Sequence, residues 1–146
     1  DVIRLPEGVV ITELENSDSV WPGSEYRTRE LDFEGYTLDK FQRPTFKYSR
    51  ENISITDKVI PVNSKFEEKP GKLRRIVKFS SDEAPSNLYF LLAQGKFEKN
   101  QEDYADEELF LSVKGGKVLA SNDDLRVPIL FKNGMSELEI TYGWAE

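Results

Sequence analysis

The fold is decided most clearly by the stretch Leu138-Glu139-Ile140-Thr141-Tyr142-Gly143-Trp144, in which large apolar residues alternate with polar or small ones. Successive side chains of a β-strand point to opposite faces, so the four apolar side chains share one face of such a strand. We therefore predict a strand with one buried face, and we expect Tyr142 and Trp144 to lie in the core.

Short runs of the same kind recur along the whole chain, separated by turn-forming residues. They follow one another at the spacing of roughly 8–12 residues that is typical of sandwiches and barrels. No segment shows a helical stripe, and the acidic segment 98–108 has room for one helical turn at most. The sequence predicts an all-β fold, an antiparallel β-sandwich that could take the jelly-roll form, with about ten strands and little or no helix. The runs are 8–14, 31–38, 45–48, 52–62, 73–79, 88–93, 109–113, 118–120, 125–131 and 138–144.

Local patterns refine this prediction. The run 88–93 is apolar on both faces, which indicates a central strand covered on both sides. Asp39 and Arg43 can pair across a turn between two of the runs. The segment Lys114-Gly115-Gly116-Lys117 is typical of a hairpin turn. Pro128 indicates a sheet edge or a bulge, because proline cannot donate a ladder hydrogen bond.

Length and composition fit a single domain over residues 1–146, which we expect to be excised from a larger protein. The chain is 38% hydrophobic and 12% aromatic, enough for a core, and no apolar run approaches the ~18 residues that cross a bilayer. The net charge of −7 disfavours nucleic acid as a partner, since phosphate binding needs a basic face. We expect neither nucleic-acid binding nor membrane insertion.

The chain contains no cysteine and no histidine. It therefore lacks disulfides, thiolate nucleophiles, imidazole bases and the usual zinc, copper and heme ligands, with Met135 as the one soft side-chain ligand. These absences predict a protein that is not an enzyme and binds no cofactor, apart from a calcium ion that acidic loops could hold. A cysteine-free domain also fits an extracytoplasmic location: the periplasm, the cell surface or the medium.

One stretch resembles a known family: Phe33-x-Gly35-Tyr36-x-Leu38-Asp39-x-x-x-Arg43-Pro44-Thr45-Phe46-x-Tyr48. It is similar to the signature of a β-sandwich accessory module in large bacterial extracytoplasmic redox proteins. Those proteins combine the module with c-type cytochrome and sugar-dehydrogenase-like domains. The resemblance implies that any heme belongs to a neighbouring domain, and it transfers no site residues. Further matching segments are Trp21-Pro22, 73–75, 88–90, Ala93-x-Gly95 and Tyr142-x-Trp144.

Four aromatic residues are candidates for binding a ligand such as a sugar ring. Tyr36, Phe41 and Tyr48 could form an exposed platform at the predicted hairpin, because a tyrosine offers an apolar ring and a polar hydroxyl. Phe46 shares a face with Tyr48, so at least one of the two is expected to pack inward. Trp21 lies in a predicted Pro-Gly loop, where functional residues concentrate. The alternative for all four is a place in the core or at its open end.

Acidic loops supply the candidate metal ligands. Asn122, Asp123 and Asp124 could hold calcium through oxygen ligands, as could the acidic residues within 101–108, although neither segment has the spacing of an EF-hand. Acidic loops are more often simply solvated. Among the basic residues, 72–75 should alternate in direction and give a solvated strand face with one arginine that points inward or pairs across strands.

Three functional hypotheses remain open. The first is a non-catalytic accessory or docking module whose partners are neighbouring domains of the same multidomain redox protein. The second is a carbohydrate-binding module that tethers such a protein to polysaccharide. The third, a hydrolase or lyase that uses carboxylates and tyrosine, is weakened by the missing histidine.

Overall fold

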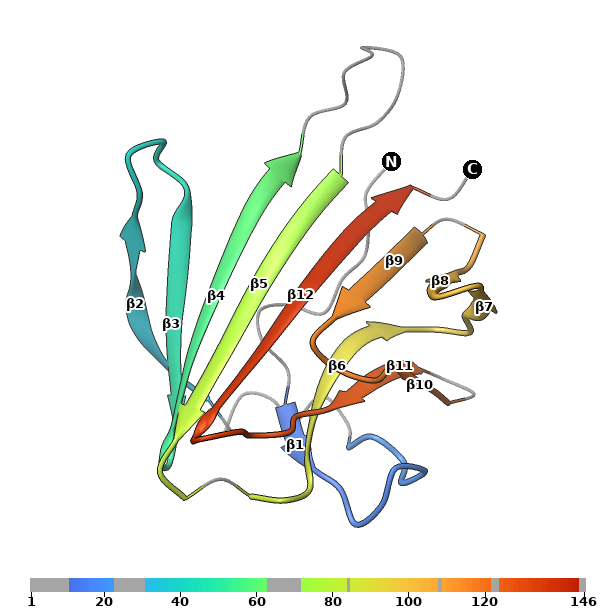
Figure 1. Ribbon diagram of the computed structural model, residues 1–146, viewed down its shortest axis with the longest axis horizontal. Helices are drawn as coiled ribbons and strands as arrows, with labels where there is room; N and C mark the ends of the chain where they lie inside the picture. The colour runs from blue at the N-terminus through green and yellow to red at the C-terminus, as the bar shows by residue number, and fades with distance from the viewer. Residues whose placement is uncertain are drawn as a thin grey trace.

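The computed structural model describes residues 11–22, 31–62, 72–83, 85–107, 109–121 and 124–144, without the side chains of Asn100 and Trp144. These residues form twelve strands in two antiparallel sheets, one of eight strands and one of four (Figure 1). No helix occurs among them, so the predicted all-β sandwich is confirmed. The expected core position of Trp144 concerns a side chain outside the described part.

The large sheet consists of two meanders joined by the C-terminal strand, in the order β2-β3-β4-β5-β12-β9-β8-β7. Adjacent strands in each meander are joined along the chain, whereas β12 enters between β5 and β9 from the far end of the sequence. The strands are β2 (Asp32–Leu38), β3 (Pro44–Arg50), β4 (Ile53–Val62), β5 (Lys72–Ser81), β7 (Glu98–Asn100), β8 (Asp103–Ala105), β9 (Leu109–Lys114) and β12 (Met135–Trp144).

The small sheet has the order β1-β6-β11-β10, with β1 (Ile11–Glu13), β6 (Leu88–Gln94), β11 (Asp124–Pro128) and β10 (Leu119–Ala120). Strand β6 is central and mostly buried, as its apolar sequence predicts. Pro128 pairs with Tyr89 on one side, while β10 ends opposite Arg126. On the other side of Pro128, the described part of the chain places no strand partner, and a bulge interrupts β11 between Leu125 and Arg126.

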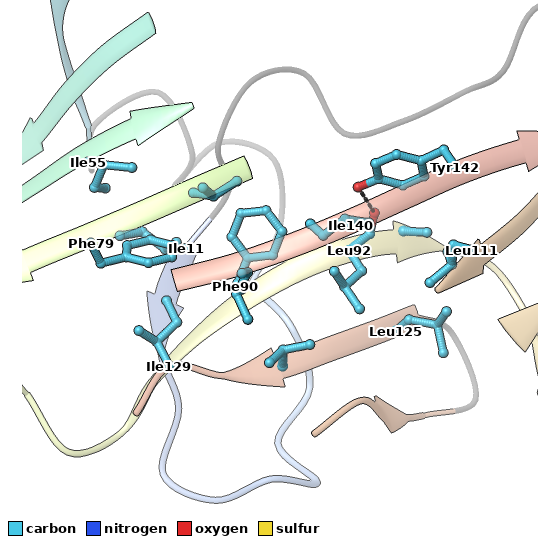
Figure 2. Packing of buried hydrophobic residues seen from close by; sticks show 14 of the residues in the cluster. Ile11, Ile55, Phe79, Phe90, Leu92, Leu111, Leu125, Ile129, Ile140 and Tyr142 are labelled. Atoms are coloured by element: carbon cyan, nitrogen blue, oxygen red, sulfur yellow. Dashed lines mark hydrogen bonds between the residues drawn. The ribbon is translucent and has the colours of Figure 1, made fainter. Parts of the chain in front are cut away.

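The hydrophobic core lies between the two sheets (Figure 2). Phe79 of β5 and Phe90 of β6 meet edge to face, with their ring centroids 6.1 Å apart. Tyr142 of β12 is buried, as predicted, and its hydroxyl donates a hydrogen bond to the carbonyl oxygen of Leu92 at 3.5 Å. These contacts place the small sheet against β5 and β12.

The small sheet is too narrow to cover the whole inner face of the large one. In Figure 1 the small sheet lies on the side of β5, β12 and β9, while β2 and β3 extend away from it. Strand β2 is exposed along most of its length, on both faces. The inner face of the large sheet thus continues past the edge of the core.

The predicted hairpin turn at 114–117 is wrong. Strand β9 belongs to the large sheet and β10 to the small one, so this segment carries the chain between sheets. The glycines are needed because space is short: a Cβ on Gly115, which has a φ of 96°, would lie 2.2 Å from the carbonyl oxygen of Glu137. A Cβ on Gly116 would lie 2.5 Å from Val127 Cγ1. The acidic segment 98–108, where one helical turn at most was expected, contains the short strands β7 and β8.

Candidate functional site

A β-bulge in β2 brings aromatic side chains to one face of the sheet. Phe33 is opposite Tyr48 and Tyr36 is opposite Phe46, with a register shift between Phe33 and Gly35. An extra residue reverses the alternation of side chains along a strand. Phe33 and Tyr36, three positions apart, therefore point to the same face, and Gly35 permits the bend with a φ of 121°.

We call Phe33, Tyr36, Phe46 and Tyr48 the aromatic face. The ring centroids of Phe33 and Tyr48 are 5.6 Å apart, and those of Tyr36 and Phe46 are 6.2 Å apart. Phe33 and Phe46 complete a chain of contacts at 6.5 Å. The rings are tilted against one another by 47–57°, which gives mutual packing rather than one flat platform.

The aromatic face is continuous with the hydrophobic core at one end and open to solvent at the other. Tyr48 packs against the core and is opposite the buried Ile55 of β4. Phe33 is 58% exposed and Tyr36 is 60% exposed. Leu38, half exposed and opposite Pro44, extends the apolar surface toward the β2–β3 turn. Phe33, Tyr36 and Leu38 thus expose large apolar side chains along one side of β2, and large apolar patches on a protein surface are typical of interaction sites.

A buried ion pair marks the boundary between the aromatic face and the core. Asp57 accepts two hydrogen bonds from Arg75, from Nε and Nη2, each 2.8 Å long, and both side chains are buried. The guanidinium also lies 5.3 Å from the ring centroid of Phe90. Burial raises the pKa of the Tyr48 hydroxyl, and the negative charge of Asp57 raises it further. The ion pair joins β4 to β5 within the large sheet, and the contact of Arg75 with Phe90 links it to β6 of the small sheet.

The basic residues 72–75 alternate as predicted. Arg75 points inward to Asp57, while Arg74 lies on the outer face and donates a hydrogen bond from Nε to Glu139 at 2.7 Å. This hydrogen bond lowers the pKa of the Glu139 carboxyl below its usual value. The single inward arginine is thus satisfied by a carboxylate of the adjacent strand β4.

The β2–β3 turn is closed by Asp39, as predicted. Its carboxylate accepts hydrogen bonds from the Arg43 and Phe41 backbone amides and from Arg43 Nε, the last at 2.9 Å. Lys58 Nζ lies 3.4 Å from the same carboxylate. The Arg43 amide in particular, together with the other donors, lowers the pKa of Asp39 well below its usual range. The exposed ring of Phe41 lies between the charged groups of Lys40 and Arg43, at 5.0 and 4.8 Å.

The four predicted ligand-binding residues do not come together. Tyr36 and Tyr48 belong to the aromatic face, and Phe41 lies at the turn beside it. Trp21 lies beside the small sheet, partly buried, with its ring 5.6 Å from the guanidinium carbon of Arg126. Arg126 Nη1 donates to the backbone carbonyl of Ser19, so Trp21 belongs to a loop that a buried arginine holds in place.

The candidate calcium ligands are only partly described, because Asn122 and Asp123 lie outside the described residues. Asp124 is buried, and its two carboxylate oxygens accept hydrogen bonds from Arg126 Nε and Nη2, both at 2.8 Å. Its charge is thereby balanced by an arginine. Asp106 accepts a hydrogen bond from the Leu109 amide at the start of β9. Within the described ranges, no three acidic side chains gather as metal ligands would.

Sequence reasoning missed Phe33 as a member of the aromatic face, although it placed Phe46 on the same face as Tyr48. Strand parity alone puts Phe33 and Tyr36 on opposite faces. The available signal was Gly35, because a glycine inside a strand often marks a bulge.

No protein-family model, curated protein or solved structure matches this chain. Among the residues described, none belongs to a helix long and apolar enough to cross a bilayer.

Proposed function

We propose that this chain is a non-catalytic accessory module of a larger extracytoplasmic protein, and that its aromatic face docks a neighbouring domain of the same polypeptide. The observation that carries the proposal is the aromatic face itself. It is apolar, continuous with the core and exposed at Phe33 and Tyr36. Aromatic residues are enriched at the centres of protein interfaces, where clusters of them supply most of the binding energy.

The two sides of β2 and β3 support a docking role for the inner side. Across these strands the inner side is apolar, from Leu38 and Pro44 to Tyr48. The outer side carries Thr45, Lys47 and other polar residues. A partner that covers the inner side would extend the core without burying an unpaired charge, because Asp57 and Arg75 already satisfy each other.

The kind of partner follows from composition and from the family resemblance. The chain has no cysteine or histidine with which to hold heme. The signature between Phe33 and Tyr48 resembles a module that accompanies c-type cytochrome domains, and it coincides with the strands that carry the aromatic face. We therefore favour a heme-bearing or dehydrogenase-like neighbour in the same polypeptide, located outside the cytoplasm.

Site-specific photo-crosslinking tests this proposal in the gene's own host. A benzoylphenylalanine at position 36 should crosslink to a segment encoded by the same gene outside residues 1–146. The matched control carries the same probe at Thr37. Thr37 is also exposed and is the next residue in the strand, but its side chain points to the other face. Equal crosslinking from both positions, or none from position 36, would refute a docking role for the aromatic face.

A carbohydrate-binding role for the same face is the second candidate. It is favoured by the exposed ring and hydroxyl of Tyr36 beside Phe46, which could stack on and hydrogen-bond to a sugar. If it holds, a neutral glycan should retain the wild-type chain and lose the Tyr36→Ser variant. If no glycan in a broad neutral array retains the wild type, this candidate fails.

A further inference from the structure

The five middle strands of the large sheet carry a concentration of positive charge on their outer face that the sequence does not reveal. The edge strands flank it with outward acidic side chains, Asp32 and Glu34 on β2 and Glu98 and Asp103 on β7 and β8. Residues opposite one another in adjacent strands share a face, so the register assigns the outward side chains of β3, β4, β5, β12 and β9. On these five strands, six of the chain's 20 Lys and Arg side chains point outward. Only two of its 27 Asp and Glu side chains, Glu137 and Glu139, do so. The six basic residues, here called the basic face, are Lys47, Lys58, Lys72, Arg74, Lys78 and Lys114.

Most of the basic face is free to bind a partner. Arg74 pairs with Glu139, and Lys58 lies near Asp39 at the sheet's edge. The other four lysines are exposed and form no ion pair with any residue of the described ranges. Lys72 Nζ lies 5.9 Å from the ring centroid of Phe110, and Lys78 is opposite Glu137. The rest of the molecule is strongly acidic, so an anionic partner would be repelled elsewhere and guided to this side.

We propose that the basic face binds an anionic polysaccharide, a polymer with carboxylate or sulfate groups along its chain. Lys47 and Lys78 lie in one row of the sheet, separated by Thr56, which puts their backbones about 10 Å apart. Lys58 lies in the next row, about 7 Å along the strand. Lysines at these distances are too far apart to bind one small anion together. Their spacing instead matches a polymer that carries a negative charge on each sugar or on every second sugar.

The residues between the lysines favour a polysaccharide over a protein. Thr56, Thr141 and Ser112 lie among the basic residues on the outer face, where their hydroxyls can hydrogen-bond to sugar hydroxyls. The aliphatic Ile60 and Ile76 lie beside Arg74 and Lys58 on the same face and can pack against the apolar side of a sugar ring. The centre of a protein interface is instead apolar and aromatic, and lysine and serine are depleted there. That description fits the aromatic face on the opposite side of the sheet.

Duplex DNA is a poorer match than a polysaccharide. It carries one charge per about 1.7 Å, far denser than lysines spaced by 7–10 Å. A net charge of −7 also opposes the close approach of a molecule large enough to reach past the basic face. The proposal is independent of the docking role above, because it uses the other side of the sheet.

Binding to immobilised alginate, a polyuronate, tests the proposal with the 146-residue chain. The wild type should bind at low salt and release as NaCl rises from about 50 to about 200 mM. The Lys47→Gln/Lys78→Gln variant should bind about tenfold more weakly, because two cationic contacts are lost. Lys96→Gln/Lys132→Gln removes the same charge from exposed positions outside the basic face and should bind as the wild type does. Circular dichroism verifies the fold of each variant.

The outcomes separate the proposal from its alternatives. Failure of the wild type to bind alginate at low salt overturns it, as does equal weakening in the two double variants. Tighter binding to duplex DNA or polyglutamate than to alginate assigns the basic face to another class of partner and also overturns it. A Tyr36→Ser variant should bind alginate normally, and its loss of binding would mean that the aromatic face is the true site.

Discussion

The inner face of the large sheet is covered by the small sheet at β5, β12 and β9 and is uncovered at β2 and β3. We call these regions the covered and the uncovered half. In the covered half, Val77, Phe79 and Leu138 have 0% exposure beneath the small sheet. In the uncovered half, Phe33 and Tyr36 are more than half exposed, although both carry large aromatic rings. Four strands cannot cover eight. Among the described residues, no strand of the small sheet covers these apolar side chains, which is the physical reason for the docking role that we propose.

The largest effect is expected where the two halves meet. Asp57→Ala should lower the free energy of unfolding by about 3–5 kcal/mol, because it leaves the buried Arg75 guanidinium unpaired. Denaturant unfolding measures this loss. Thr56→Ala, on the outer face of the same strand, should change stability by less than about 0.5 kcal/mol. Asp57→Ala/Arg75→Met should recover part of the loss, and a harmless Asp57→Ala would mean that the pair does not anchor the boundary.

Truncation within the covered half should cost slightly less. Leu138→Ala should lower the free energy of unfolding by about 3 kcal/mol, since it removes buried methyl groups and leaves a cavity against the small sheet. Thermal and denaturant unfolding should agree on the loss. A change below about 1 kcal/mol would show that the two sheets do not pack tightly at this point.

Acid should weaken the uncovered half through Asp39. Its pKa is lower in the folded chain than in the unfolded one, so its contribution is present above the usual carboxyl pKa of about 4 and is lost as pH falls through the lowered value. Asp39→Asn removes this contribution. The stability difference between the wild type and Asp39→Asn should therefore be larger at pH 6 than at pH 3. A constant difference would contradict the hydrogen bonding at the β2–β3 turn.

The smallest effect is expected on the aromatic face. Tyr36→Ser should change the free energy of unfolding by less than about 0.5 kcal/mol, because its side chain is mostly in water and buries little surface. The comparison with Leu138→Ala is direct, since both residues lie on the inner face of one sheet. A cost of several kcal/mol for Tyr36→Ser would show that the ring supports folding and that the two halves do not differ as described.

The sequence predicted the strands well but not their partners. Alternation in 138–144 and the apolar run 88–93 depend on local burial, which the sequence records directly. The division into sheets of eight and four depends on pairings between distant segments, such as β12 between β5 and β9. For the same reason Gly115-Gly116 suggested a hairpin, whereas those glycines serve a crossing between sheets.

The candidate site was predicted only in part. Of the predicted platform of Tyr36, Phe41 and Tyr48, the two tyrosines belong to the aromatic face. Asp39 was correctly paired with Arg43. Phe33 belongs to the aromatic face only because of one bulge in β2. Trp21 lies away from that face because it contacts Arg126, 105 positions later in the sequence. Neither a local reversal of parity nor a long-range contact can be recognised from hydrophobic periodicity alone.

Hydrogen exchange on β2 and β3 tests the central claim most directly. The amides of these strands are compared in the 146-residue chain alone and in the complete polypeptide that its gene encodes. The docking role predicts stronger protection of β2 and β3 in the complete polypeptide, while β5 and β12 stay equally protected in both. Identical protection of β2 and β3 in the two proteins would contradict a partner on the aromatic face.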